Sequence, residues 1–303
     1  MTPAVEADRL THRYGRQEAV SELSFQVPES SIYAFLGPNG AGKTTTIKIL
    51  MNLLRPSGGH AAVLGIPSSR LGPEGLQNIG YVSENQKLPE SMTLDQLAAF
   101  CAPLYPKWDD SLCSTLVQRF DLPRRQKISS FSRGMKMKTA VVMSLAYRPR
   151  LLILDEPFSG LDPVVRDEII EGMLEIAGRG EWSVLVSSHD LSEVENLADH
   201  VGFIRQGRMV VSEPLESLQR RFREVEVTLA QPCPQPQPWP AAWLRARISE
   251  RVVRFVDSEY DEARTAERVH QLFDDAEAVA SPMSLREIFV ALAREERHGG
   301  TDA

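Results

Sequence analysis

The stretch GPNGAGKTTT, residues 37–46, decides the fold of this chain. It directly follows the apolar run IYAFL (32–36) and leads into the helical sequence IKILMNLL (47–54). The stretch matches the pattern G-x-x-x-x-G-K-[ST] between a strand and a helix, where such a loop cradles the phosphates of a nucleotide. Its glycines let consecutive N–H groups face one anion, and the positive end of the following helix points to the same place. An incidental glycine turn would not bring all these features into register, so the sequence predicts nucleotide binding.

Two side chains of this loop have their own expected tasks. Lys43 reaches the β and γ phosphates and is a catalytic candidate, and the Thr44 hydroxyl can ligate Mg²⁺. The loop alone does not separate GTPases, kinases and motor ATPases, although the chain contains no guanine-reading NKxD motif. Upstream, Tyr14 is a candidate to stack on adenine, and an ordinary strand tyrosine is a nearly equal alternative. The loop residues expected to bind the nucleotide are Gly37, Pro38, Asn39, Gly40, Ala41, Gly42, Lys43, Thr44 and Thr45.

A second strong feature is LLILDEPFSGLD, residues 151–162. An apolar strand there delivers Asp155 and Glu156 at its carboxyl end, where ligands bind in α/β sheets. We expect Asp155 to hold Mg²⁺ and Glu156 to polarise the water that attacks the γ-phosphate. Solvated loop acids are the plainer alternative, but the apolar run and the upstream loop argue against it. His189 follows the apolar run SVLVSS (183–188) and is expected to hydrogen-bond the γ-phosphate.

Short apolar runs between helical stretches predict an α/β fold with a mostly parallel sheet that is covered on both faces. Alternating hydrophobicity before residue 32 predicts antiparallel strands at the start, and the pattern from about 85 to 148 predicts an inserted helical subdomain. We expect one domain over residues 1–224 and a small α+β accessory domain over 225–303, where Ser284 and Glu287 fit a capping box. The runs expected to be strands of the main sheet are IYAFL (32–36), IGYV (79–82), LLIL (151–154) and SVLVSS (183–188).

The length, net charge and cysteine content of the chain limit its expected partners and location. It has 303 residues, a formal charge of −7 and a pI of about 5.5. A nucleic-acid-binding protein usually shows a basic footprint instead, so we expect no nucleic-acid partner. The three cysteines form neither a metal spacing nor a disulfide framework, which favours a reducing compartment. No apolar region approaches the roughly 20 residues of a membrane span, so any work at a membrane would need another chain to cross it.

Taken together, these motifs resemble those of the ATP-binding cassette (ABC) ATPases over about residues 1–224. GPNGAGKTT resembles the Walker A motif, LLILDEP resembles Walker B, SGLD (159–162) resembles the D-loop, and SSHD, which contains His189, resembles the switch-histidine segment. FSRGM (131–135) falls at the position of the LSGGQ signature. The resemblance implies a P-loop NTPase fold of ABC type, hydrolysis of ATP with Mg²⁺ as cofactor, and nucleotide contacts from Ser132 and Gly134.

The sequence departs from the family pattern in two motifs. The signature reads Phe-Ser-Arg-Gly-Met rather than Leu-Ser-Gly-Gly-Gln, and it keeps the serine and the second glycine. Variants of the form x-Ser-x-Gly-Met are common among exporter-type members, so the resemblance implies a working site. In the Q-loop, the glutamine position holds Glu84, and Gln86 lies two positions later. Glu84 has an oxygen that could face Mg²⁺ and is a metal candidate beside Thr44 and Asp155, but it adds negative charge near the acids after the strand.

The resemblance also implies partners. In this family one ATP is held between two ATPase domains, so a chain with one phosphate loop and one signature implies a head-to-tail homodimer or heterodimer. The motifs and the tail resemble the ATPase subunits of ABC-2-type exporters. That implies a separate transmembrane permease, a groove bordered by Glu84 to Leu94 that grips a short permease helix, and a cytoplasmic chain peripheral on the inner face of the cell membrane. The competing interpretation is a soluble ABC ATPase that remodels a protein or senses an antibiotic without transport.

Overall fold

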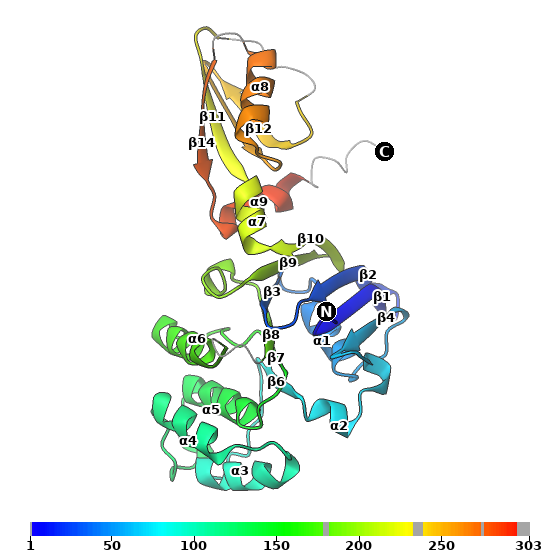
Figure 1. Ribbon diagram of the computed structural model, residues 1–303, viewed down its shortest axis with the longest axis vertical. Helices are drawn as coiled ribbons and strands as arrows, with labels where there is room; N and C mark the ends of the chain where they lie inside the picture. Colours follow the sequence, from blue (N-terminus) through cyan, green and yellow to red (C-terminus); the bar gives the residue numbers. More distant parts are fainter. Residues whose placement is uncertain (1, 178–181, 233–238, 274–275, 296–303) are drawn as a thin grey trace. The chain divides into compact units, whose positions relative to one another are not determined.

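The computed structural model describes residues 2–177, 182–232, 239–273 and 276–295 (Figure 1). It divides into two compact units, Met1–Ser212 and Glu213–Ala303. The division lies before the boundary expected after residue 224, because the helix α7 (Leu215–Arg221) belongs to the second unit. The guanidinium of Arg221 holds it there, since it donates to the Glu213 carboxylate at 2.5 Å and to the Ser258 carbonyl at 2.7 Å.

The main sheet of the first unit has six strands in the order β10-β9-β3-β8-β7-β6 (Figure 1). The strands β9, β3, β8, β7 and β6 pair in parallel. Every residue of β3, β7 and β8 is buried, as expected for a parallel sheet with both faces covered. The predicted strands are confirmed. The bounds are β3 (Ile32–Leu36), β6 (Ile79–Ser83), β7 (Leu151–Asp155), β8 (Ser183–Ser188), β9 (His200–Arg205) and β10 (Arg208–Pro214).

The antiparallel sheet expected near the start is also present, in the order β2-β1-β4-β5. The helix α1 (Lys43–Leu50) shares one hydrophobic core with both sheets, because it buries Ile47 and Leu50 in the cluster that contains Phe25 of β2 and Phe35 of β3. These two phenylalanine rings stack with centroids 5.2 Å apart. The bounds are β1 (Val5–Tyr14), β2 (Gln17–Val27), β4 (Gly58–Val63) and β5 (Ile66–Pro67), followed by η1 (Ser68–Arg70) and α2 (Pro73–Leu76).

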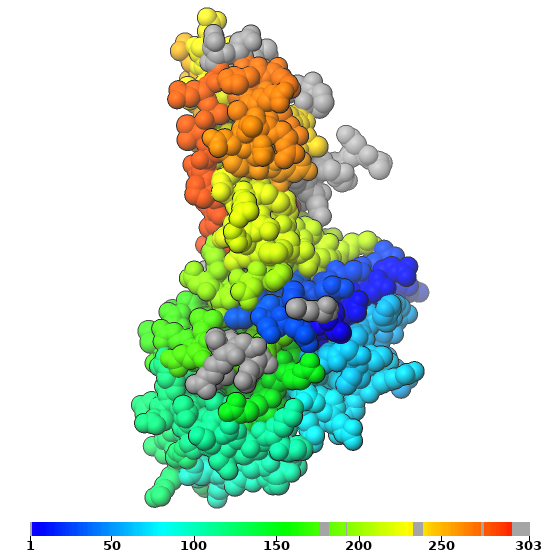
Figure 2. Space-filling view, viewed as in Figure 1, coloured from blue at the N-terminus to red at the C-terminus, as the bar shows by residue number. Residues whose placement is uncertain are grey.

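The inserted helical subdomain is confirmed between β6 and β7. Thr93 and Gln96 form a capping box at its first helix, and Asp109 and Ser132 accept backbone N–H bonds as N-caps of the later two. Figure 2 shows the segment between β6 and β7 as one contiguous region, coloured teal to green. The elements of the subdomain are α3 (Leu94–Cys101), η2 (Ala102–Leu104), α4 (Asp110–Arg119), η3 (Ile128–Ser130) and α5 (Arg133–Leu145). Two further elements lie outside it: α6 (Pro163–Ala177) follows β7, and η4 (Leu191–Glu193) follows β8.

The second unit is the expected small α+β appendage. Its sheet is antiparallel, in the order β12-β13-β11-β14, and its core includes Trp243 stacked on Phe255 with centroids 3.8 Å apart. The predicted capping box is confirmed, because Ser284 N donates to Glu287 at 2.8 Å and Glu287 N donates to the Ser284 hydroxyl at 3.3 Å. The remaining elements are β11 (Arg223–Leu229), β12 (Trp243–Ser249), β13 (Val252–Asp257), α8 (Glu262–Leu272), β14 (Ala276–Pro282) and α9 (Leu285–Glu295).

Candidate functional site

The parallel register brings the predicted motifs to one edge of the main sheet. Asp155 at the end of β7 pairs with Ser83 on one side and Ser187 on the other. Leu36, the last residue of β3, pairs with Ser188. The chain segments that leave these strands therefore start side by side at the carboxyl edge, where ligands bind in α/β sheets. The phosphate loop, the paired acids and His189 all belong to these segments.

The backbone of the phosphate loop requires glycine at three positions. Gly40 and Gly42 have φ of 79° and 111°, in the left-handed region that favours glycine. A side chain on Gly42 would also place its Cβ 2.5 Å from the Ala19 carbonyl oxygen. At Gly37 the corresponding distance to the Ile204 carbonyl oxygen is 2.3 Å. The loop therefore packs closely against β2 and β9. Gly42 is also the N-cap of α1, and the N–H groups at the N-terminus of this helix can bind an anion.

The Lys43 ammonium is buried inside the loop. Its Nζ donates to the Gly37 carbonyl at 2.5 Å and to the Pro38 carbonyl at 3.3 Å. It also lies 3.0 Å from Glu156 Oε1 as an ion pair that lacks hydrogen-bond alignment. Carbonyls and a carboxylate are thus the present partners of a buried cation, and phosphate oxygens are ligands of the same kind with greater negative charge.

Asp155 is a buried carboxylate with two hydroxyl donors on the same oxygen. Thr44 Oγ1 donates to its Oδ1 at 3.1 Å, and Ser187 Oγ donates at 2.8 Å. Burial raises the pKa of the Asp155 carboxyl, and the hydrogen bonds from Ser187 and Thr44 oppose that shift. The converging oxygens of Thr44 and Asp155 fit Mg²⁺, which takes one or two protein carboxylates together with substrate phosphates. Within the described ranges, no group of three or more His, Cys, Asp or Glu side chains is arranged so that it could hold a metal ion.

Asp155→Asn is expected to stabilise the nucleotide-free protein by about 0.5–2 kcal/mol while it abolishes turnover. Because burial raises the pKa in the folded state, ionised Asp155 costs stability, and this cost grows as the pH rises from the unfolded pKa through the raised folded pKa. Asparagine stays neutral and can still accept both hydroxyl bonds. Urea unfolding at neutral pH and in acid near the ordinary aspartate pKa checks this, since the stability advantage of the variant should shrink as the pH falls. Equal or lower stability of the variant at neutral pH would contradict it.

Glu156 connects the phosphate loop to His189. Its Oε2 lies 2.7 Å from His189 Nδ1, and its Oε1 faces Lys43. The backbone at Glu156 is strained, with φ of 53°, and its N–H donates to Ser187 Oγ at 3.0 Å. A non-glycine residue held in this region by its surroundings is a recurrent feature of active sites. Glu156 is buried whereas His189 is exposed, so the histidine stands between the buried acid and solvent.

The sequence did not predict that Ser187 and Ser188 support the residues of this site by hydrogen bonds. Ser187 binds both Asp155 and the Glu156 backbone, as described above. Ser188 donates to Glu193 Oε2 at 2.5 Å and accepts from Asp190 N at 2.9 Å, which fixes the chain around His189. Burial raises the pKa of Glu193. The available signal was the serine pair that ends the otherwise apolar run SVLVSS at the carboxyl edge of the sheet.

Tyr14 lies at the end of β1 in the antiparallel sheet rather than at the carboxyl edge. Its ring is 49% exposed and packs edge-on against His12, with centroids 4.7 Å apart and an interplanar angle of 78°. His12 is in turn fixed by a 2.9 Å hydrogen bond between its Nδ1 and the Arg55 carbonyl. Tyr14 is thus about half exposed, and stacking on adenine would use an exposed ring of this kind.

Ser132 and Gly134 lie in the first turn of α5. Ser132 Oγ accepts from Met135 N at 3.2 Å, so the serine is the N-cap expected at a helix start. Gly134 packs against the start of α6, because an added Cβ would lie 2.7 Å from Val165 Cγ1. The glycine therefore has a packing role inside the chain in addition to the nucleotide contact expected from the sequence.

Glu84 follows β6 and contacts the segment after Asp155. Its Oε1 accepts from the Ser159 hydroxyl at 2.9 Å and lies 3.7 Å from Arg133 Nη2. Nearby, Gln86 Oε1 accepts from both the backbone N–H and the hydroxyl of Ser83, each at 3.2 Å. The Glu84 carboxylate is thus engaged with Ser159 and Arg133, and the Gln86 amide caps the turn after β6.

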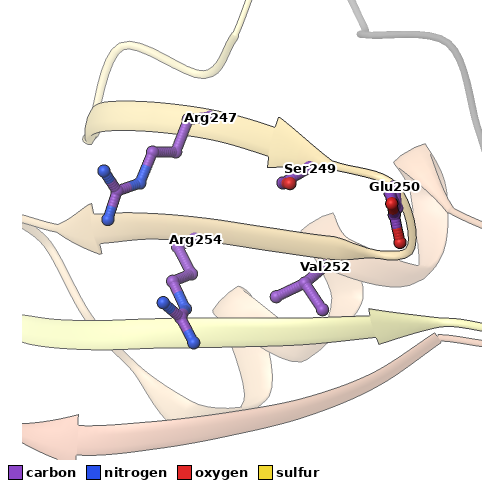
Figure 3. Close-up of a pocket in the computed structure, with 5 residues that line it drawn as sticks. All are labelled: Arg247, Ser249, Glu250, Val252 and Arg254. Carbon is purple, nitrogen blue, oxygen red and sulfur yellow. The ribbon is translucent and has the colours of Figure 1, made fainter.

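The second unit has a hollow of its own, of about 530 Å³, on the sheet strands β12 and β13 (Figure 3). Arg247 and Arg254 are cross-strand partners, and Figure 3 shows both side chains on the same side of the sheet. The Glu226 carboxylate offsets their repulsion, since it accepts from Arg254 at 2.6 Å. The hollow is lined by two cations and the acid Glu250 and has no counterpart of the glycine loop or of the buried acids, so the candidate catalytic residues all lie in the first unit.

Comparison with known sequences finds a matching family model and similar proteins. The family model described as "ABC transporter" matches residues 20–159. The bacitracin transport ATP-binding protein BcrA of Bacillus licheniformis is 33% identical over 226 residues, which cover 74% of each chain. The lantibiotic transport ATP-binding protein SrtF of Streptococcus pyogenes is 34% identical over 223 residues, covering 71% of this chain and 95% of that protein.

Solved structures also resemble this chain over about seven tenths of its length. One described as the ATP-binding subunit of an ABC transporter has a TM-score of 0.65 and 29% identity, and covers 72% of this chain and 92% of its own. A dimeric ATP-binding cassette, solved in a post-hydrolysis state with ADP and phosphate, has a TM-score of 0.62 and covers 70% and 98% respectively. Its identity is 19%, so this second likeness concerns the fold alone.

Proposed function

This chain belongs to the family of ABC transporter ATP-binding proteins, and from that premise we propose that it drives an ABC-2-type exporter. It is the ATP-binding and ATP-hydrolysing subunit of an ABC transporter. The observation that best supports ATP hydrolysis is that the Glu156 carboxylate contacts both Lys43 and His189 beside the glycine loop. The relatives named for bacitracin and lantibiotic transport support export of a molecule of that kind. They also favour transport over the alternative of a soluble remodelling or sensing ATPase.

Each group at the sheet edge has a task in ATP hydrolysis. The loop residues Gly37–Thr45 surround the phosphates with N–H groups, and Lys43 exchanges its carbonyl and carboxylate partners for phosphate oxygens. Glu156 accepts a proton from the attacking water, and His189 holds Glu156 and the γ-phosphate in register. Thr44 and Asp155 would hold Mg²⁺, which supplies charge neutralisation at the phosphates. Glu84 remains a candidate metal contact only if its carboxylate leaves Ser159 and Arg133.

The complete catalytic unit is proposed to be a head-to-tail dimer. Ser132 caps a 13-residue helix whose N-terminus carries no internal acid in its first turn, which suits an external anion. In the dimer that anion is the γ-phosphate of ATP on the partner's loop. A two-fold arrangement then makes two shared sites, and a homodimer has both Glu156 and His189 in each. Pairing with a related second cassette would satisfy the same geometry.

We place the permease contact in a groove between the helical subdomain and the core, to which residues of α2 and β6 also contribute. The groove has a volume of about 370 Å³ and is lined mostly by apolar and aromatic side chains, among them Leu88, Leu97 and Tyr105. It includes residues 86–89 of the segment expected from the sequence. Beside it, Phe100 and Leu104 are exposed large hydrophobic residues. An amphipathic helix buries its apolar face in such a groove. The structure has no helix among its described residues with the length and apolar character of a membrane span, and the proposed site of action is the inner face of the membrane.

Phe100→Glu is expected to abolish association with the permease and leave basal ATPase activity unchanged. The side chain is 57% exposed, so a charge there leaves folding intact but puts a carboxylate against an apolar partner helix. Affinity purification of the tagged chain from detergent-solubilised membranes, with identification of a polytopic membrane protein by mass spectrometry, measures the association. The matched control is Leu53→Glu, a 62% exposed residue that does not line the groove.

The same experiment tests the proposed function. Wild-type chain should recover the membrane protein and hydrolyse ATP. Recovery of active ATPase without any membrane protein, under conditions that preserve complexes, would overturn the exporter assignment. Equal recovery with Phe100→Glu would overturn the placement of the groove.

A further inference from the structure

In each of the two motifs that depart from the family pattern, one of the departing residues contacts the other motif. Glu84 stands at the glutamine position of the Q-loop, and Arg133 stands at the first glycine of the signature. Arg133 Nη2 lies 3.7 Å from Glu84 Oε1. The same carboxylate oxygen accepts the Ser159 hydroxyl at 2.9 Å. An acid in one motif is therefore accompanied by a cation in the other, and the D-loop serine binds to the acid.

Arg133 also lies directly on the D-loop backbone. At Gly160 an added Cβ would be 2.8 Å from Arg133 Nη1 and 3.2 Å from its Cζ. Gly160 has φ of 65°, so both its conformation and the space taken by the guanidinium favour glycine. Arg133 thus touches the D-loop at Gly160, and Glu84 binds it at Ser159.

This contact leads to the catalytic acid. Ser159 N donates to the Glu156 carbonyl at 3.4 Å, which closes the turn that follows the strained Glu156 backbone. The position of Ser159 is therefore linked on one side to the Glu84 carboxylate and on the other to the peptide that sets the direction of the Glu156 side chain.

We propose that Glu84 and Arg133 are a charge-compensated positioning pair that fixes the D-loop, and through it Glu156, for hydrolysis. The inference rests on the proposed ATPase function and deepens it. Without Arg133, the Glu84 charge adds to those of Asp155 and Glu156, and the D-loop loses its contact at Gly160. With a neutral amide at position 84 there is no charge to compensate, and Arg133 is dispensable.

A purely stabilising surface pair would behave differently. The side chains of Arg133 and Glu84 are 53% and 40% exposed, and exposed ion pairs contribute only about 0–1 kcal/mol to folding. The pair should therefore have a small effect on unfolding and a larger one on turnover. A guanidinium that binds the partner's nucleotide directly would also behave differently, because its contribution would not depend on the residue at position 84.

The test is a double-mutant cycle with Arg133→Gly, Glu84→Gln and the combined variant in the full-length chain. The measured quantities are kcat, the KM for ATP and the unfolding midpoint. We expect Arg133→Gly to lower kcat about 5–10-fold with KM for ATP and unfolding nearly unchanged, which is within the range of coupling between contacting residues. The combined variant should recover at least half of the lost kcat. The matched control is Arg124→Gly, which breaks the similarly exposed Arg124–Asp95 pair (3.4 Å) of the same subdomain and should leave kcat unchanged.

The outcomes separate the inference from the function it rests on. If the wild-type chain neither binds nor hydrolyses ATP, the proposed function fails. If the wild type is active but the losses from Arg133→Gly and Glu84→Gln multiply in the combined variant, the pair is not coupled and the inference is overturned. An equal loss with Arg124→Gly, or a parallel fall of the unfolding midpoint, would also overturn it, because the effect would then be structural.

Discussion

Glu156→Gln should bind ATP as the wild type does and lose turnover by about 10²–10³-fold. Glutamine keeps the length of the side chain and an oxygen that can face His189 or Lys43, so the 2.7 Å and 3.0 Å contacts of Glu156 need little rearrangement. What disappears is the capacity to accept a proton from the attacking water. The loop that holds the phosphates, with Lys43 inside it, is untouched by this change.

The measurement pairs equilibrium binding of a fluorescent ATP analogue with phosphate release under saturating ATP. Lys43→Ala is the contrasting variant, because removal of the buried ammonium should weaken nucleotide binding itself as well as turnover. The two variants thus separate the binding and chemical steps. Turnover of Glu156→Gln near the wild-type rate would show that another group accepts the proton.

The parts of the site that local sequence patterns specify could be predicted. The phosphate loop is one continuous segment, and its strand and helix neighbours are adjacent in the chain, so its residue types carry the geometry with them. The acids after β7 and the histidine after β8 follow from a general rule, since parallel strands bring their carboxyl ends to one edge. The strands were predicted nearly to the residue because fully buried strands read as unbroken apolar runs.

Contacts between distant segments could not be read in the same way. The sequence marked Glu84 as unusual and suggested Mg²⁺ as its partner, whereas the carboxylate lies against Ser159 and Arg133, 75 and 49 positions away in the chain. Nothing in the local pattern of either segment specifies which side chain a surface acid meets. The packing of Gly134 on Val165 is likewise invisible before α5 and α6 are placed.

The division between the two units falls earlier in the chain than the expected boundary for a related reason. The sequence SLQRRFRE reads as the end of the first domain because it precedes the alternating run VEVTLA. In the structure most of this segment belongs to the helix α7. Its residue Arg221 donates hydrogen bonds to the Glu213 carboxylate and to the Ser258 carbonyl, which lies further along the chain in the second unit. Hydrophobic periodicity locates an element well but does not say which neighbouring core it joins.

The second large effect is expected at the signature, and the packing of Gly134 decides how it must be tested. Gly134→Asp should block ATP-driven dimerisation, lowering the association constant by at least about 10²-fold, because a carboxylate would face the γ-phosphate at the helix N-terminus. The same substitution also pushes a Cβ to 2.7 Å from Val165 Cγ1, so the single variant would confuse repulsion with misfolding.

Val165→Ala removes the clashing methyl groups and supplies the proper background. In that background, Gly134→Ala adds only a methyl group, whereas Gly134→Asp adds the charge. Combined with Glu156→Gln, which lets the ATP-bound dimer accumulate, all three chains can be compared by light scattering with and without ATP. The Val165→Ala chain and its Gly134→Ala version should dimerise, and the Gly134→Asp version should bind ATP as a monomer. If the aspartate version dimerises as well as the alanine version, no phosphate approaches this helix, and the start of α5 is a packing element of one chain rather than half of a shared site.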